Sequence, residues 1–505
     1  MRKISDRYTA LVLLFILLIV RLFVLFRFNL NYVDSDELIN WIATRDMSQG
    51  LFYTPFYYGQ FYSTNLEAFF ASPLVYLGIP NRLAIPVVSN AIGFAPFVLL
   101  FFHFWRKKQM HLAIFSAAIG CLMPIEFHLI TSLARGFTGG LLFFFSGFVL
   151  LFGSSNSAKS IGLSFIGLSV LVNPNSILLL FPLSILLVYN HLYQNKYNLK
   201  LLILPILIFT STFLWLHFFK RNYPELETHV LPTLKASFDI FATGIQKFDY
   251  RFRYLVPFFP AQGWVILVLF AMILLFRKKL NIEKSLLLAF IAAFVAVFAT
   301  FAINKTDDGM ASVYFPYSRM YLAIPFLFLI PFIFQKALNQ RFIQTLSFLA
   351  VLSAIIGLFR LNKVIKYAVN QNPDFVTAIS HKQLCQDCEA IKKLYKKSGA
   401  EALVFYSKSD VYNYGCNAID PQFKSVLPLY ERRYWEWEKH NKKVFDRILF
   451  LDEKHQFADS LKVFSGQLLP FQKGKIDAFL LQNNTYYLHE IYAKNNFEYH
   501  PKLKK

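Results

Sequence analysis

The sequence predicts a polytopic α-helical membrane protein with a small C-terminal α/β domain outside the membrane. Of the 505 residues, 56% are hydrophobic and only 16% are charged, and the mean hydropathy of +0.42 is too high for an ordinary soluble protein. About eleven apolar runs approach the ~20 residues with which a helix crosses the hydrocarbon core. Residues 360–505 differ, because charges are frequent there and no run is long enough to span.

The apolar runs are predicted to be transmembrane helices. The first is long and no small-residue cleavage site follows it, so we interpret it as a retained helix instead of a signal peptide. The stretch Asn173-Pro174-Asn175 divides one apolar region into two short halves. The predicted runs are approximately residues 8–27, 84–105, 111–131, 137–153, 160–173, 176–190, 200–218, 263–276, 285–303, 320–335 and 342–359.

Clusters of Lys and Arg predict the orientation. With the division at Asn173–Asn175, four basic clusters fall on one side, which the positive-inside rule assigns to the cytoplasm; they are residues 1–7, 106–108, 277–284 and 336–341. We therefore expect a multi-pass protein of the plasma (inner) membrane with a cytoplasmic N-terminus. The extracytoplasmic face receives residues 28–83, 219–262, 304–319 and 360–505. This placement explains the net charge of +22 without nucleic acid as a partner.

The chain is thus divided into a transmembrane module, residues 1–359, and an extracytoplasmic domain, residues 360–505. Within that domain, residues 402–406 and 478–481 are predicted to be buried strands, and residues 385–397 a helix. It contains three of the four cysteines, Cys385, Cys388 and Cys416, which allow one disulfide and one free thiol in an oxidising compartment. Their spacing does not identify the pairing, and no second Cys or His pair supports a zinc site.

The first outer segment, residues 28–83, carries the most concentrated charge. Asp34, Asp36 and Glu37 follow the first apolar run directly. Apolar residues recur from Leu38 onward and predict an amphipathic helix along the membrane surface, which would hold the carboxylates at the interface. The alternative is that these are solvated loop charges, or an acidic cluster at a helix N-terminus favoured by the helix dipole. Spacing alone leaves both open.

The residues around this segment carry a resemblance to a known family. The pattern Ala43…Gly50…Pro55-Phe-Tyr-Tyr-Gly-Gln60…Leu66-Glu67 resembles the GT-C superfamily of integral-membrane glycosyltransferases. It is most similar to the family 39-like branch, which contains protein O-mannosyltransferases and lipid A aminoarabinose transferases. The resemblance is strongest over residues 30–80 and weaker at 134–137 and 317–325. It implies a GT-C fold and inverting transfer of a sugar from a polyprenyl phosphate to an acceptor hydroxyl at the outer face.

The resemblance also implies roles for the carboxylates. Asp36 matches the catalytic base, Glu37 is its neighbour and Asp34 is a further carboxylate. An attacking hydroxyl becomes acidic as its bond to the anomeric carbon forms, so a nearby carboxylate can take its proton. Asp34 and Asp36 also make a D-x-D pair that could bind Mg²⁺ or Mn²⁺. Several members of the branch need no metal at the reacting centre, and no other cofactor is expected.

The departing phosphate requires fixed positive charge. Arg319 matches the late arginine of the family, and a glycine follows Arg135. The full set of arginines expected to bind the donor phosphate is Arg319, Arg135, Arg251 and Arg253. The alternative is that arginines at helix ends anchor lipid headgroups, so membrane lipid is a further expected partner.

Four weaker candidates for substrate binding complete the predicted site: Tyr58, Gln60, Glu67 and Glu126. The aromatic residues between Phe52 and Tyr62 are typical of an interfacial belt, with Tyr58 as the residue best able to stack on a sugar. A charge at bilayer depth costs at least ~2.5 kcal/mol, which makes Glu126 a candidate; Arg21 is explained by snorkelling or by a partner on a neighbouring helix.

Two other classes of function stay open. A transporter or flippase of polyprenyl-linked glycans places charges on broken helices, usually in two related halves. The break at Asn173–Asn175 fits this class, but no second half mirrors it. A non-catalytic envelope-assembly protein could bind anionic glycans or lipids through its basic outer domain, yet it would not need the carboxylates. The sequence does not identify the sugar, nor whether the acceptor is protein, lipid or polysaccharide.

Overall fold

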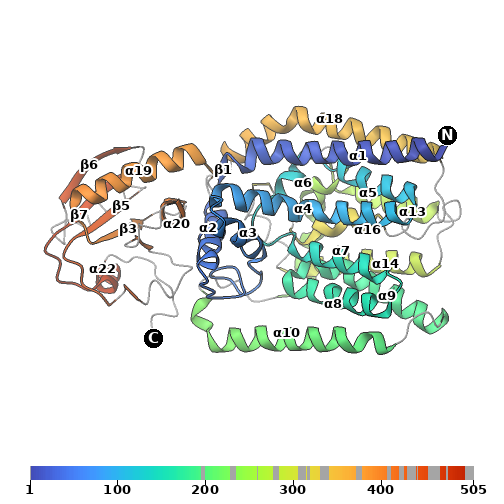
Figure 1. Ribbon diagram of the computed structural model, residues 1–505, viewed down its shortest axis with the longest axis horizontal. Coiled ribbons are helices and arrows are strands. Elements are labelled where there is room, and N and C mark those ends of the chain that lie inside the picture. The colour runs from blue at the N-terminus through green and yellow to red at the C-terminus, as the bar shows by residue number, and fades with distance from the viewer. Residues whose placement is uncertain are drawn as a thin grey trace. The chain divides into compact units, whose positions relative to one another are not determined.

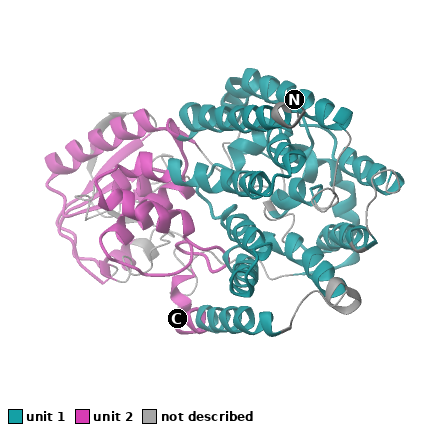
Figure 2. Cartoon of the chain, turned by 45° about the vertical axis from the view of Figure 1, so that its right-hand side comes forward, with its two compact units in different colours: residues 1–29, 86–217, 232–372 teal, residues 30–85, 218–231, 373–505 magenta. Residues whose placement is uncertain are grey.

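Helices make up most of the chain, and its longer strands form one sheet in the C-terminal part (Figure 1). The structure is a computed structural model that divides into two compact units (Figure 2). Unit 1 comprises residues 1–29, 86–217 and 232–372, and unit 2 comprises residues 30–85, 218–231 and 373–505. The residues that it describes are 2–194, 199–227, 235–258, 260–276, 284–304, 314–315, 319–329, 340–370, 378–406, 411–419, 426–428, 439–440, 442–452, 467–473 and 476–494.

Unit 1 is helical in its described residues. Its longer helices are α1 (Arg2–Val24), α4 (Asn81–Arg106), α5 (Met110–Leu122), α7 (Gly139–Leu151), α8 (Asn156–Val172), α9 (Ile177–Gln194), α10 (Ile203–Asn222), α11 (Phe238–Gln246), α13 (Trp264–Leu275), α14 (Lys284–Ala299) and α18 (Gln340–Asn370). Shorter helices and turns are η1 (Leu25–Asn29), α6 (Ile125–Ile130), η2 (Pro174–Ser176), η3 (Leu199–Leu202), α12 (Phe248–Phe252), η5 (Arg253–Leu255), η6 (Thr300–Ala302), η7 (Arg319–Ala323) and α16 (Ile324–Leu327). Helices α4 and α10 each extend by a few residues into unit 2.

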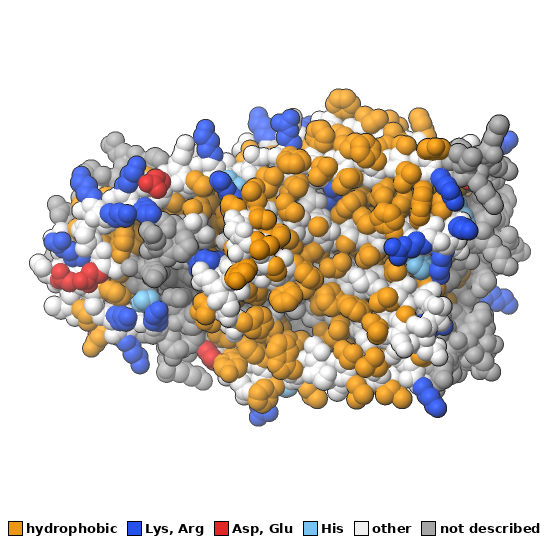
Figure 3. Space-filling model, in the orientation of Figure 1, with side chains coloured by type: hydrophobic (Ala, Val, Ile, Leu, Met, Phe, Trp, Pro, Cys, Tyr) orange, Lys and Arg blue, Asp and Glu red, His pale blue; other side chains and the backbone are white. Residues whose placement is uncertain are grey.

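The apolar helices agree with the predicted membrane-protein class. Among the described residues, four helical stretches are long and apolar enough to cross a membrane: Asp6–Asn29, Asn81–Arg106, Lys200–Asn222 and Gln340–Asn370. Shorter apolar helices occupy most of the other predicted runs. Apolar side chains cover much of the visible helical surface (Figure 3), and Phe348 and Phe359 of α18 are 68% and 85% exposed, as expected for contact with lipid. The total of about eleven spans and their orientation stay predictions.

Breaks in the apolar runs have local causes. The run predicted at 111–131 is two helices, α5 and α6, because Pro124 has no N–H to donate and disfavours a helical conformation at Met123. The Leu122 carbonyl at this break accepts bonds from the Phe258 amide (2.7 Å) and the Ser353 hydroxyl (3.0 Å). The predicted division at Asn173–Asn175 is confirmed, since α8 and α9 are separate helices.

The last spans differ more from prediction. Helix α18 runs to Asn370, beyond the predicted end at 359, and lies beside α1 (Figure 1). The predicted run 320–335 is described only to residue 329. The basic clusters at 277–284 and 336–341 fall almost entirely outside the described residues.

Unit 2 combines the first outer segment with the C-terminal part. Its helices are α2 (Ser35–Ser48), α3 (Leu66–Tyr76), η4 (Pro224–Leu226), α19 (His381–Ser398), α20 (Val411–Ile419) and α22 (Leu488–Lys494). Its strands are β1 (Tyr32–Val33), β2 (Ile379–Ser380), β3 (Ala402–Tyr406), β4 (Val426–Pro428), β5 (Ile448–Asp452), β6 (Gln467–Lys473) and β7 (Ile476–Leu481). The predicted strands at 402–406 and 478–481 and the helix at 385–397 are present.

The main sheet has the strand order β4-β3-β5-β7-β6. Strand β3 is parallel to β4 and β5, whereas β7 is antiparallel to β5 and β6. A second, two-stranded sheet joins distant parts of the chain, because Tyr32 of β1 pairs with Ser380 of β2 and Val33 with Ile379. Helix α2 packs against α3 and α20. Residues 30–85 therefore fold together with residues 373–505, whereas the sequence suggested a boundary at residue 359.

Candidate active site

The three neighbouring carboxylates lie at the start of helix α2. Asp34 is its N-cap residue, and its Oδ1 accepts a hydrogen bond from the Glu37 amide at 2.9 Å. Asp36 and Glu37 occupy the first turn, where negative charge meets the positive end of the helix dipole. The alternative of an acidic cluster at a helix N-terminus thus describes Asp34 well.

The same three carboxylates differ in burial. Asp34 is 0% exposed and Glu37 2% exposed, whereas Asp36 is half-buried. The backbone carbonyl of Asp36 accepts a hydrogen bond from the Tyr57 hydroxyl. Among the three, Asp36 is therefore the residue that keeps part of its surface accessible. Its backbone is held by the helix cap and by Tyr57.

Helix α2 is not the amphipathic surface helix that the sequence predicts. Every residue from Glu37 to Thr44 is buried, because α3 and α20 pack against the helix. The predicted helix is present, but its amphipathic character with one exposed face is wrong. The buried Thr44 hydroxyl is accommodated because it donates to the backbone carbonyl of Asn40 at 2.7 Å.

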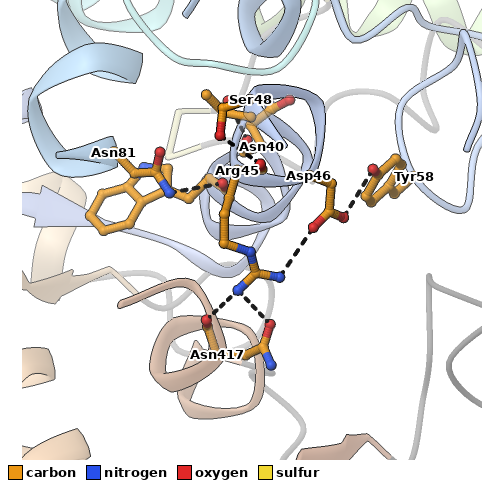
Figure 4. Close-up of polar contacts among 9 residues, drawn as sticks. Asn40, Arg45, Asp46, Ser48, Tyr58, Asn81 and Asn417 are labelled. Atoms are coloured by element: carbon orange, nitrogen blue, oxygen red, sulfur yellow. Dashed lines mark hydrogen bonds and ion pairs between the residues drawn. The ribbon is translucent and has the colours of Figure 1, made fainter. Parts of the chain in front are cut away.

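A partly buried polar network holds the C-terminal end of α2 (Figure 4). Arg45 donates from Nη1 to the backbone carbonyl (2.7 Å) and side-chain oxygen (3.2 Å) of Asn417 in α20. Its Nη2 pairs with Asp46 Oδ1 at 3.2 Å. The other oxygen of Asp46 accepts a bond from the Tyr58 hydroxyl at 3.1 Å. Asn81 adds a bond from its side chain to the Trp41 carbonyl at 3.0 Å.

The weaker candidates of the first outer segment are all buried. Tyr58 is 0% exposed and its hydroxyl bonds Asp46, so the structure assigns it to the network and not to an open sugar-stacking surface. Gln60 is buried, and its backbone N–H donates to the backbone carbonyl of Tyr57. Glu67 is 1% exposed in the first turn of α3. The interfacial-belt interpretation is also wrong for Phe56, which is buried with these tyrosines.

In unit 1, the segments that carry Arg135 and Arg319 meet at one turn. The Asn173 side chain donates to the Gly136 carbonyl at 2.6 Å, and η2 directly after Asn173 packs against η7, which begins at Arg319. Gly136 has φ +70°, a conformation that explains the glycine after Arg135. The Arg135 guanidinium is buried 5.7 Å from the ring centre of Tyr314, and the Arg319 side chain lies outside the described part of the chain.

Arg251 and Arg253 have opposite environments. Arg251 is 0% exposed, with its guanidinium 5.0 Å from the ring centre of Phe301. A Cβ on Gly244 would stand 2.8 Å from Arg251 Nη1, so this arginine is enclosed by α11 and η6. Arg253 is exposed. The two predicted phosphate ligands therefore differ in accessibility.

Glu126 is paired with an arginine that the sequence analysis missed. Its Oε1 bonds Arg360 Nη2 at 2.7 Å, with 4% and 31% of the two side chains exposed. Helix α6 packs against α18 and η5, which brings Arg253 within electrostatic reach of Glu126. Helix spacing could have indicated Arg360 as a candidate. It lies about 30 Å along α18 from Gln340, so it is about one membrane thickness away from the basic cluster at 336–341.

Arg21 has partners on neighbouring helices, as one of its two interpretations predicts. It donates to the Asn90 side chain (3.0 Å) and carbonyl (2.9 Å) of α4. It also donates to the His128 carbonyl (2.9 Å) and the Thr131 hydroxyl (2.8 Å). Arg21 therefore joins the end of α1 to the middle of α4 and to the end of α6, and does not snorkel.

The possible cation site at Asp34 and Asp36 is not supported by their surroundings. Asp34 Oδ1 is used by the helix cap. Within the described residues, no three His, Cys, Asp or Glu side chains gather in a way that could hold a metal ion. The described residues thus do not fit a Mg²⁺ or Mn²⁺ site at this pair.

Comparison with known proteins identifies the fold. No protein-family model and no curated protein matches the chain. Among solved structures, it is similar to that of ArnT from Cupriavidus metallidurans in the apo state, with a TM-score of 0.54 and 10% identity over 94% of this chain and 98% of that chain. The chain has the ArnT fold. The sequence resemblance to the aminoarabinose transferase branch is thereby confirmed at the level of fold.

A second ArnT structure from the same organism is also similar. It is bound to undecaprenyl phosphate, and it aligns with a TM-score of 0.47 and 12% identity over 94% of this chain and 97% of that chain.

Proposed function

We propose that the protein is a membrane glycosyltransferase that moves a sugar from a polyprenyl phosphate to an acceptor hydroxyl, with inversion, at the outer face of the membrane. The observation that carries this proposal is Asp36, the half-buried carboxylate in the first turn of α2. Its neighbours are a capping residue, Asp34, and a buried acid, Glu37. A shared fold does not imply a shared reaction, so the proposal depends on this residue and its sequence context.

Asp36 would act as the base. The positive end of the α2 dipole favours its ionised form. As the acceptor oxygen bonds the anomeric carbon, its proton becomes acidic and passes to the carboxylate, while the bond between the sugar and the phosphate breaks. Attack from the face opposite the phosphate inverts the anomeric centre. The bonding pair leaves with the polyprenyl phosphate.

Arg135 and Arg319 would stabilise the departing phosphate. Their segments both contact the turn at Asn173–Ser176, and a buried guanidinium such as that of Arg135 meets negative charge more strongly than an exposed one. Arg253 is exposed and could join them. Arg251 is enclosed against Phe301, and we leave it out of the phosphate-binding set.

The test is donor-dependent transfer in membrane vesicles that contain the full chain. The probes are polyprenyl-phosphate mannose and polyprenyl-phosphate aminoarabinose, and mass spectrometry of vesicle glycans, lipids and proteins detects the product. We expect Asp36→Asn to lower transfer by about 10²- to 10⁴-fold. The control is Asp239→Asn, which changes an exposed aspartate at the start of α11 and should transfer normally.

Full activity of Asp36→Asn would contradict the assignment of the base. Movement of a labelled donor across the bilayer without any new glycosidic product would favour the transporter or flippase. If the cell envelope differs between cells with and without the protein, and Asp36→Asn has the same effect as the unchanged protein, the assembly protein would be favoured.

A further inference from the structure

We propose that helix α20 of the C-terminal part positions the carboxylate helix α2, and that Arg45 and Asn417 are positioning residues for the transfer reaction. We call α20 and its contacts with α2 the α20 clamp. The proposal rests on the function proposed for Asp36. It concerns groups that do not reach the reacting atoms: Arg45 lies nine positions after Asp36, which is about 13 Å along the helix.

Helix α20 has an anchor of its own on α19. Cys388 of α19 and Cys416 of α20 form a disulfide. The Tyr412 hydroxyl of α20 donates to Asp387 Oδ2 at 3.1 Å, and the Gln383 side chain holds both oxygens of Asp387 at 2.8 Å. The clamp therefore has a fixed base that does not depend on α2.

The clamp contacts α2 at two points. The first is Leu38, 0% exposed: a Cβ on Gly415 of α20 would stand 3.2 Å from Leu38 and 2.8 Å from Leu384 of α19. Glycine at 415 thus lets α20 fit between the two helices. The second point is Arg45, which donates twice to Asn417.

The spacing of these two points defines what the clamp does. Leu38 and Arg45 are seven positions apart, so they lie on one face of α2, two turns apart. Contacts at both points restrict the rotation of the helix about its axis and its sliding along that axis. Asp36 is two positions from Leu38, about 200° around the helix, and therefore lies on the opposite face. The clamp therefore holds the side of α2 opposite Asp36, which we call the back of α2, and does not itself cover Asp36.

The guanidinium of Arg45 connects the clamp to the loop that carries Tyr57 and Tyr58. Arg45 also bonds Asp46, whose second oxygen accepts from Tyr58. The adjacent Tyr57 bonds the carbonyl of Asp36. A chain of contacts thus leads from Asn417 to the backbone of Asp36. Lysine at position 45 could not maintain both branches, because a single ammonium lacks the planar two-sided donor geometry of guanidinium.

The first test measures hydrogen exchange by mass spectrometry on the purified full chain and needs no substrate. For Arg45→Gln, we expect the amides of residues 38–44 to exchange on the order of tenfold faster, the factor expected from losing a charge-assisted hydrogen bond. Strands β3 and β5 should exchange as in the unchanged protein. The control Arg447→Gln alters an exposed arginine of unit 2. Unchanged exchange in α2, or equal acceleration throughout unit 2, would overturn the proposal.

The second test measures transfer kinetics with the donor probe that the unchanged protein uses. We expect Arg45→Gln to lower kcat about tenfold while the KM for the donor stays within about twofold, since a displaced base affects the transition state more than donor binding. Arg45→Lys should recover part of kcat. A raised KM with normal kcat would contradict positioning. If the unchanged protein transfers no sugar, the proposed function fails, and the exchange experiment still decides whether α20 restrains α2.

Discussion

Charged residues are arranged in opposite ways in the two units, at the start of α2 in unit 2 and at the arginine-bearing turns of unit 1. At α2, three carboxylates adjacent in sequence receive three environments: a helix cap for Asp34, a half-buried position for Asp36 and full burial for Glu37. In unit 1, Arg135 and Arg319 are far apart in sequence, yet their segments contact the same turn at residues 173–176. The carboxylates of α2 are neighbours in sequence but differ in environment, whereas the segments of Arg135 and Arg319 are distant in sequence but contact the same turn.

The largest expected effect separates the two aspartates of α2. We expect Asp36→Asn to lower sugar transfer by about 10²- to 10⁴-fold. Asp34→Asn should stay within about threefold of the unchanged protein, because asparagine is an equally good N-cap. Initial transfer rates in vesicles with matched protein amounts measure the ratio. Equal losses of transfer rate in the two variants would contradict separate roles for Asp34 as a helix cap and Asp36 as the base.

The disulfide should make a large contribution to the stability of unit 2. It closes a loop of 28 residues between Cys388 and Cys416, for which the chain-entropy model gives about 3 to 4 kcal/mol. We therefore expect Cys416→Ala to lower the free energy of unfolding by that amount in denaturant titrations. The matched control is Cys385→Ser, since Cys385 is a free thiol one helical turn from Cys388, and it should cost much less.

In unit 1, the ion pair between Glu126 and Arg360 should contribute slightly less to the free energy of unfolding than the disulfide does in unit 2. Removing one partner of a buried pair costs about 3 kcal/mol, and the partial exposure of Arg360 places Glu126→Gln at or below that value. The exposed pair of Glu389 and Lys393, with 61% and 77% of the side chains exposed, is the comparison. Glu389→Gln should change the free energy of unfolding by less than about 0.5 kcal/mol. Similar effects of both variants would show that burial does not set the difference.

The smallest expected effect is a pH dependence of unit 2. Burial lowers the pKa of His381 to about 4, although the carbonyls of Leu30 and Tyr32 oppose the shift. Between about pH 4 and 6.5 the unfolded chain binds the extra proton and the folded chain does not. His381 therefore leaves the free energy of unfolding unchanged above about pH 6.5 and lowers it increasingly as the pH falls below that value. At pH 5 the expected loss is about 2 kcal/mol.

Unfolding followed at several pH values measures this loss. His381→Phe keeps an aromatic ring beside Trp41, 5.2 Å away in the present structure, and should remove that part of the pH dependence. An unchanged pH profile in this variant would contradict the assignment to His381.

Local sequence signals were reliable where a residue acts on its own backbone. Asp34 can cap a helix because its carboxylate reaches the amide three residues ahead, and the Asn-Pro-Asn stretch ends α8 because proline cannot continue the hydrogen-bonding pattern. The apolar strands at 402–406 and 478–481 also follow from their own composition. Such features depend on contacts within a few residues, which a sequence displays directly.

The errors concern partners far away in the chain. The amphipathic interpretation of α2 was wrong because α20, whose Asn417 lies 372 positions from Arg45, covers the helix. Arg360 was overlooked because nothing in the sequence near Glu126 indicates a partner 234 positions away. The aromatic residues around Tyr58 were assigned to the interface because composition does not distinguish a ring facing lipid from one facing the protein interior.

The sequence by itself determined a helical membrane protein and a helix near the acidic residues, and its family resemblance singled out Asp36 as the residue to test. Only the tertiary structure decided that Asp34 and Glu37 are enclosed, that Cys388 pairs with Cys416 and that α20 packs against α2. The physical reason is that apolar patterning and helix capping are short-range. The burial of a charge and the pairing of a thiol depend on which distant segment fills the adjacent space.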